Sequence, residues 1–125
     1  GLTRVLKEKE IGGIVFQPLA GGLLTGKYLN GIPEDSRMKR DNRFLKPENL
    51  TEDTLRKLNA LKEIADARGQ KMHHLALQWA LRDEVITSAL IGASRPEQIT
   101  DNLEALQAPP LTAEELEKIE TILQD

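Results

Sequence analysis

The sequence predicts an α/β fold with parallel strands, and two kinds of segment support this prediction. Residues 11–16 and 85–91 are short, mostly apolar runs that contain β-branched residues and have the length of strands. Their lack of regular polar alternation is typical of parallel strands that are covered on both faces. Segments with helical periodicity precede, separate and follow these runs, and such alternation indicates βα units.

The first part of the chain is expected to contain a helix, a strand and a long loop. Residues 2–10 carry apolar side chains at helical spacing. The strand predicted at residues 11–16 is closed by Pro18. Residues 21–49 show no sustained periodicity, and loops of this length inside a domain are usually functional or disordered.

The second part is expected to be mainly helical. Apolar stripes predict helices from about residue 51 to residue 69 and over residues 72–82. The segments SRPE and TAEE, which begin at Ser94 and Thr112, have the form of capping boxes and predict two further helix starts.

Composition limits the class of protein and its partners. The chain has 125 residues and a net charge of −3, which favours one globular domain and argues against general nucleic-acid binding. It has no cysteine, so disulfides and thiolate metal sites are excluded. No apolar run reaches membrane-spanning length and the first residues do not resemble a signal peptide, so we expect no membrane insertion and a cytoplasmic location. Homo-oligomerisation stays open.

The segment IGASRPEQITDN, residues 91–102, has the form of a phosphate site at the end of a strand. It runs from an apolar stretch through a glycine into a helix that Ser94 is expected to cap. A helix N-terminus offers unpaired N–H groups and a partial positive charge to an anion. Arg95 adds a permanently charged guanidinium that matches phosphate geometry. The alternative interpretation is an ordinary helix cap beside a solvated arginine.

The segment FQPLAGGLLTGKY, residues 16–28, resembles the loop after strand seven of the aldo-keto reductases. Residues 91–102 are similar to the strand-eight loop and helix of that family, and the two segments occur in the family's order. Residues 31–37, GIPEDSR, resemble the branch that includes bacterial glyceraldehyde 3-phosphate reductases and potassium-channel β-subunits. The resemblance implies that residues 1–125 form the C-terminal segment of a single barrel domain, with strands seven and eight of a (β/α)₈ TIM barrel. Two parallel strands alone do not make a self-sufficient sheet, which also indicates a piece of a larger fold.

The resemblance implies that the cofactor is NADP(H), bound by the loops after strands seven and eight, where barrels often bind phosphate. The pyrophosphate and nicotinamide side would be lined by Pro18, Leu19, Ala20 and Gly22. Lys27 would reach a phosphate, and Ser36 and Arg37 would close over the cofactor. The adenosine half would be held by Gly92, Ser94, Arg95, Gln98 and Asn102, with Arg95 at the 2′-phosphate.

Local chemistry supports part of this assignment. Small residues at positions 20–22 let backbone N–H groups approach an anion closely. Gln98 and Asn102 are four residues apart, so they share one face of a helix. Gln17 stands where the family usually has serine, and no cofactor contact is assigned to it.

No catalytic residue is assigned to this chain. By resemblance, the family moves a hydride from the nicotinamide to a carbonyl, and a tyrosine donates the proton with help from a lysine, an aspartate and a histidine. All four lie on earlier strands, and Tyr28, the only tyrosine here, belongs to another motif. We therefore expect the complete protein to reduce small aldehydes or ketones, such as a phosphorylated triose aldehyde or methylglyoxal, and this segment alone to be inactive.

Two alternatives of other classes remain. One is a regulatory NADP(H) sensor similar to the potassium-channel β-subunits, and the other is an inactive stand-alone interaction fragment. His73 and His74 are expected to form no metal site, because neighbours on a helix point about 100° apart and no carboxylate has a suitable spacing. Trp79 is expected to pack in the core.

Overall fold

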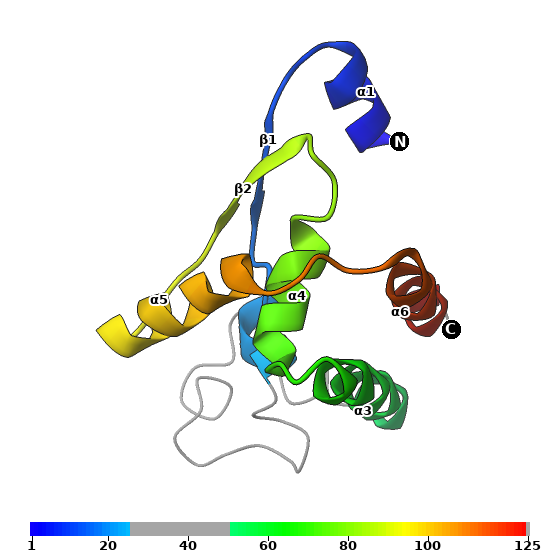
Figure 1. Cartoon of the computed structure of the whole chain (residues 1–125), viewed down its shortest axis with the longest axis vertical. Coiled ribbons are helices and arrows are strands. Elements are labelled where there is room, and N and C mark those ends of the chain that lie inside the picture. Colours follow the sequence, from blue (N-terminus) through cyan, green and yellow to red (C-terminus); the bar gives the residue numbers. More distant parts are fainter. Residues whose placement is uncertain (26–50, 125) are drawn as a thin grey trace.

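A computed structural model of the chain describes residues 1–25 and 51–124. The elements follow the predicted order (Figure 1). They are α1 (Leu2–Glu8), β1 (Gly13–Phe16), the 3₁₀ helix η1 (Ala20–Thr25), α3 (Glu52–Ala67), α4 (Met72–Ala80), β2 (Ile86–Leu90), α5 (Pro96–Leu103), the 3₁₀ helix η3 (Glu104–Gln107) and α6 (Ala113–Gln124). The predicted site residues Lys27, Ser36 and Arg37, with most of the predicted long loop, lie outside the described residues. No helix in the described ranges has the length and apolar character needed to cross a membrane.

β1 and β2 pair in parallel, as the sequence predicts. Val15 lies opposite Ala89 and Phe16 opposite Leu90, and the register shifts between Gly13 and Ile14. Because paired parallel strands end at the same edge of a sheet, the segments that follow β1 and β2 leave that edge side by side. Figure 1 shows both strands running away from α1 toward the end of the molecule that holds η1 and α5. This pairing positions the candidate site.

The prediction that both strands are covered on both faces is wrong for the described part of the chain. Ile14 and Phe16 of β1 are 73% and 74% exposed, and Leu90 of β2 is 64% exposed. The helices pack against one another and leave these side chains without a layer to cover them. The apolar pattern of the strands therefore predicts that other elements pack on both faces, and the described residues do not provide those elements.

The core lies between three helices. Its buried side chains come from α3, α4 and α6: Leu58, Leu61, Ala65, Met72, Leu75 and Ile119. The stripe on α3 recurs every three or four residues, which places these side chains on one face of the helix. Trp79 packs against this cluster, which confirms its predicted place in the core.

The starts of α3 and α6 are both capped by threonine side chains, and the cap of α6 is the one that the sequence predicts. Thr51 accepts a hydrogen bond from the Thr54 N–H at 3.1 Å. At α6, the Thr112 N–H donates to Glu115 Oε1 at 2.9 Å, and the Glu115 N–H donates to Thr112 Oγ1 at 3.1 Å. This reciprocal pair is the capping box predicted at Thr112.

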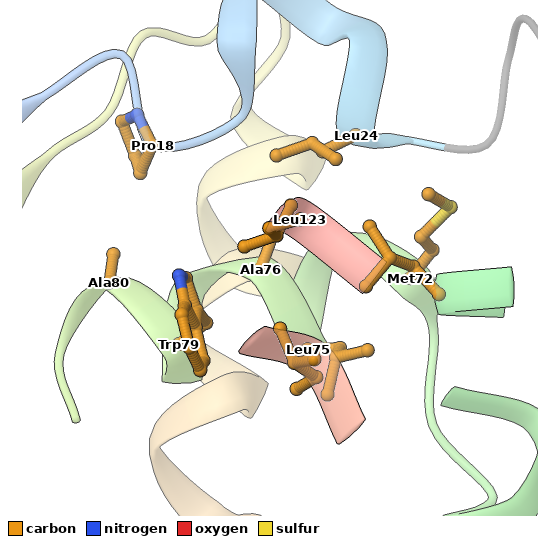
Figure 2. A pocket seen from close by; sticks show the side chains of 10 residues that line it. Pro18, Leu24, Met72, Leu75, Ala76, Trp79, Ala80 and Leu123 are labelled. Atoms are coloured by element: carbon orange, nitrogen blue, oxygen red, sulfur yellow. The ribbon is translucent and has the colours of Figure 1, made fainter. Parts of the chain in front are cut away.

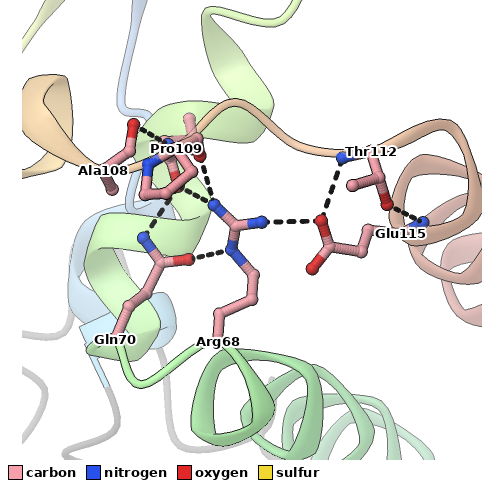
Figure 3. Close-up of polar contacts among 7 residues, drawn as sticks. Arg68, Gln70, Ala108, Pro109, Thr112 and Glu115 are labelled. Atoms are coloured by element: carbon pink, nitrogen blue, oxygen red, sulfur yellow. Dashed lines mark hydrogen bonds and ion pairs between the residues drawn. The ribbon is translucent and has the colours of Figure 1, made fainter.

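Arg68, at the end of α3, ties α3 to α4, α6 and the chain before α6 (Figure 3). Its guanidinium donates to Glu115 Oε1 at 2.6 Å, to Gln70 Oε1 at 2.6 Å and to Gln78 Oε1 at 3.2 Å. It also donates to the carbonyl of Pro109. The Arg68 side chain is 10% exposed and that of Glu115 is 21% exposed, so this ion pair is shielded from water much more than the helix-surface pairs are.

Replacing Glu115 with glutamine tests how much this charge contributes. The Arg68 guanidinium and the Thr112 N–H together hold the pKa of Glu115 below its ordinary value of 4.5. Glutamine keeps the capping acceptor but loses the charge, so we expect Glu115→Gln to lower the free energy of unfolding by about 1–2 kcal/mol at pH 7. Because the folded-state pKa is depressed, this contribution is present above pH 4.5 and is lost as the pH falls through the folded-state pKa.

Urea denaturation of both proteins at pH 7 and pH 3 measures the difference. The control is Glu114→Gln, since Glu114 forms only a pair with Lys118 in which both side chains are more than half exposed. An equal loss in the two variants, or a Glu115→Gln effect that does not shrink in acid, would contradict the assigned role of the charge.

Candidate functional site

The segment after β1 is held in an unusual backbone conformation. Gln17 and Ala20 have φ angles of 54° and 51°, and Gly22 has a φ of 104°. Positive φ is costly for residues with a Cβ, and such residues concentrate at functional sites. The N–H groups of Ala20 and Gly22 donate to the carbonyls of Gln17 and Leu19, each at 3.0 Å, which closes η1 as a tight 3₁₀ turn. Residues 17–22 therefore form a strained turn at the end of a strand.

Apolar contacts anchor this turn to the helical core. Pro18 and Leu24 line a cavity of about 160 Å³ together with Ala76, Trp79 and Ala80 of α4 (Figure 2). No charged side chain lines the cavity, so it does not suit a phosphate. Its role here is to fix the position of the turn after β1.

The segment after β2 leads into α5, whose start differs from the prediction. The N-cap residue is Arg95, not Ser94, and Pro96 is the first helical residue. The predicted capping box between Ser94 and Glu97 is therefore wrong. Proline has a fixed φ and no N–H to satisfy, so it is favoured at the first helical position and sets the start one residue later. Gln98 Oε1 accepts from the Ser94 N–H at 2.8 Å and from the Ser94 hydroxyl at 3.3 Å, which ties the residues before α5 to its first turn.

Arg95 is exposed and has no side-chain partner among residues 1–25 and 51–124. The other arginines in those ranges each contact an acceptor or an aromatic ring: Arg4, Arg56, Arg68 and Arg82. A guanidinium that has no partner in those ranges and stands at a helix start fits an anionic group such as a phosphate.

Gly92 lies in open space, with no atom of the described residues within 4 Å of the position of an added Cβ. Its φ is not positive, so neither packing nor backbone geometry explains a glycine there. Because glycine has no Cβ, a ligand can approach the backbone at Gly92 more closely than at any other residue type. Arg95 and Gly92 together leave a positive charge and open space after β2, and their assignment to NADP(H) stays a prediction.

The remaining predicted residues of α5 face the protein more than solvent. Gln98 is half-buried and its carbonyl oxygen already bonds to Ser94, while Asn102 is 9% exposed. Both residues lie on α5 four positions apart, and their assignment to the cofactor stays a prediction. Gln98 positions the turn that carries Ser94 and Arg95.

The structure brings the two predicted segments to the same edge of the β1–β2 sheet. Pro18, Leu19, Ala20 and Gly22 follow β1, whereas Gly92, Ser94 and Arg95 follow β2, and Phe16 pairs with Leu90 where the strands end.

The sequence prediction missed a cluster on the helices. The expectation that His73 and His74 have no suitable carboxylate nearby is wrong, because both side chains meet Asp101 of α5. Asp101 is 28 residues from His73, so no local pattern signals the contact.

The fold and the two segments agree with what comparison with known proteins finds. A family model described as the Aldo/keto reductase family matches residues 1–124, so this chain belongs to that family. The chain is α/β and forms part of a (β/α)₈ barrel, as the sequence predicts.

Individual relatives indicate the branch of the family that this chain resembles. The chain is 51% identical over 128 residues to an L-glyceraldehyde 3-phosphate reductase from Escherichia coli O157:H7, and covers 100% of itself and 37% of that protein. It is 42% identical to a probable voltage-gated potassium channel subunit beta from Oryza sativa subsp. japonica, covering 91% of the chain and 36% of the relative. These relatives confirm the branch that the sequence resembles. The chain spans little more than a third of the length of either relative.

Solved structures give the same result. A glycerol dehydrogenase from Gluconobacter oxydans matches with a TM-score of 0.75 and 27% identity, over 97% of this chain and 36% of that one. An aldo-keto reductase from Bacillus halodurans in its holo form matches with a TM-score of 0.64 and 28% identity, over 96% of this chain and 36% of that one.

The strained turn after β1 can be tested by exchanging its small residues. Gly22→Ala places a Cβ on a residue with a φ of 104°, so we expect the free energy of unfolding to fall by about 1–2 kcal/mol. The matched change Ala20→Gly relieves a positive φ and should leave stability within about 0.5 kcal/mol of the parent or raise it, because relief of strain offsets the added freedom of the unfolded chain. Urea denaturation of the two variants measures both effects, and similar losses in both would show that positive φ is not the cause.

Proposed function

We propose that this chain is the NADP(H)-binding C-terminal part of an aldo-keto reductase barrel that reduces small aldehydes or ketones to alcohols. The observation that carries the proposal is Arg95 at the start of α5, whose guanidinium has no partner among the described residues and lies on the sheet edge where the strained turn after β1 also lies. A dinucleotide phosphate needs cationic and N–H donors at one end and closely approachable backbone at the other. The two segments offer these features at neighbouring strand ends.

The division of work within such a site follows from the described residues. NADPH supplies the hydride when it is bound. The Arg95 guanidinium would bind phosphate oxygens, and the open space at Gly92 would admit the adenosine part. Ala20 and Gly22 keep the turn after β1 narrow, which would let the pyrophosphate approach its backbone closely. Proton donation to the carbonyl is assigned to strands outside this chain.

The exposed strands support the placement in a larger barrel. Ile14, Phe16 and Leu90 are apolar and uncovered, and the β1–β2 pair has two open edges within the described residues. In a closed parallel barrel such side chains are buried by neighbouring strands and by the helical layer. The share of the relatives' length that this chain spans agrees with six further strands elsewhere.

The substrate that the comparisons favour is a phosphorylated triose aldehyde, since the Escherichia coli relative with 51% identity is named for that substrate. The second candidate function is a cofactor-dependent sensor that binds a channel, which the 42% identity to a potassium channel subunit beta favours. Both functions use the same nucleotide site, so the site residues do not distinguish them.

Substitution of Arg95 tests the cofactor assignment. In the complete protein, Arg95→Ala should weaken NADPH binding by about 10- to 100-fold, the loss expected when a charged hydrogen bond to the 2′-phosphate is removed. NADH lacks this phosphate and should lose less than about threefold.

Dissociation constants from fluorescence titration give both numbers. Arg4→Ala is the control, because Arg4 carries the same charge on α1, at the opposite end of the strands (Figure 1). Equal losses for NADPH and NADH would remove the role of Arg95.

Turnover distinguishes the reductase from the sensor and tests the need for the other strands. The complete protein should oxidise NADPH in the presence of glyceraldehyde 3-phosphate, whereas residues 1–125 alone should show no turnover, because no proton donor is assigned to them. Absorbance at the nicotinamide band follows the reaction. Tight NADPH binding without turnover of any small aldehyde would favour the sensor, and turnover by residues 1–125 alone would contradict the division of the site.

A further inference from the structure

A cluster of two imidazoles and one carboxylate joins the first turn of α4 to α5. His73 Nε2 lies 2.5 Å from Asp101 Oδ2, and His74 Nε2 lies 3.3 Å from Asp101 Oδ1 and 2.7 Å from the Asp101 carbonyl oxygen. The two rings meet edge to face, with centroids 4.4 Å apart. One ligand atom from each of the three residues lies within 4.8 Å of the other two.

Asp101 explains how neighbouring histidines reach one point. Side chains at successive positions of a helix diverge by about 100°, so His73 and His74 alone do not face each other. Asp101 lies across from both of them on α5 and presents both of its carboxylate oxygens. The side chains of His73 and His74 are 15% and 8% exposed, and that of Asp101 is 27% exposed, so the cluster is ordered by packing yet remains open to an ion.

We propose that His73, His74 and Asp101 form a binding site for a divalent transition-metal ion of the zinc class. Imidazole nitrogen with one carboxylate oxygen suits zinc and its neighbours, whereas magnesium and calcium prefer oxygen alone. Three protein ligands leave a fourth tetrahedral position for water.

The geometry needs an adjustment at each histidine. Metal–ligand bonds of about 2.0–2.1 Å place tetrahedral ligand atoms roughly 3.3 Å apart. The distance between His74 Nε2 and Asp101 Oδ1 already has this value of 3.3 Å, but His74 Nε2 also donates to the Asp101 carbonyl at 2.7 Å, so an entering ion must replace that proton and break that bond. The contact between His73 Nε2 and Asp101 Oδ2, at 2.5 Å, must open by roughly 0.8 Å for an ion with such bond lengths to enter.

The charges around the cluster suit a bound cation, although Lys71 competes with the ion for the Asp101 carboxylate. Hydrogen bonds from Lys71 and His73 lower the pKa of Asp101 to about 2, so its carboxylate is ionised at neutral pH. Lys71 Nζ lies 2.7 Å from Asp101 Oδ1 and is the competing cation, but its side chain is 61% exposed and is free to turn into solvent.

Titration of tag-free protein tests the site. We expect Zn²⁺ to bind with a 1:1 stoichiometry by calorimetry, and Co²⁺ to give the intense visible absorption of a four-coordinate ion. Asp101→Asn and His73→Ala should each weaken Zn²⁺ binding by at least about 10- to 100-fold. That is the loss caused by removing a residue that only hydrogen-bonds to a metal ligand, and a direct ligand contributes at least as much. Lys71→Met removes the competitor and should tighten binding by about two- to fivefold, the range that an exposed ion pair supports.

The matched control is Asp66→Asn, which removes another exposed carboxylate paired with a lysine, Lys62 of α3. It should leave Zn²⁺ binding unchanged. Circular dichroism identifies any variant that fails to fold. Lys71→Met is informative even then, because its expected effect is a gain in Zn²⁺ affinity, which misfolding does not produce. Three results would each contradict the proposed site. They are equal effects of Asp101→Asn and Asp66→Asn on Zn²⁺ binding, no gain in Zn²⁺ affinity in Lys71→Met, and no stoichiometric Zn²⁺ binding to the parent protein.

Discussion

The parallel pairing of β1 with β2 is the constraint on which the candidate site depends. It brings the ends of two strands, far apart in sequence, to one edge, so that the turn after Phe16 and the helix start after Leu90 lie side by side. The proposed nucleotide site rests on one local feature of each segment: positive φ at Ala20 and Gly22 in one, and in the other the Arg95 guanidinium, which has no partner among the described residues. Without the pairing these would be a strained turn and an ordinary helix start.

The helices hold this edge in place through contacts of two kinds. Leu58, Leu75 and Ile119 form an apolar centre that gives general cohesion, since burial of apolar area is not directional. Arg68 adds direction, because its planar guanidinium satisfies acceptors from three separate parts of the chain at once. The helical unit is thus fixed in orientation as well as packed, and α4 carries the turn after β1 on its surface.

The sequence predicts features that depend on neighbours in the chain and misses those that do not. The strands, the helices and the capping box at Thr112 are local and are observed. The capping box predicted at Ser94 does not form, because Pro96 occupies the first helical position. The preference of proline for this position is also local, but the spacing of Ser94 and Glu97 predicts an earlier helix start. The Arg68–Glu115 contact and the His73–Asp101 contact join residues 47 and 28 positions apart, and periodicity carries no information over such separations. Strand burial fails for another reason, since it depends on partners beyond the described residues.

The long separation of β1 and β2 also has a consequence for the order of folding. Residues 13 and 86 are partners, and closing a loop of about 70 residues costs conformational entropy before any contact compensates for it. The helices between them form through short-range contacts and therefore precede the sheet. During that interval Ile14 and Phe16 lie on a strand with both edges unpaired, which is the arrangement that recruits other chains. We therefore expect the rate at which this strand finds its neighbours to govern the yield of soluble protein.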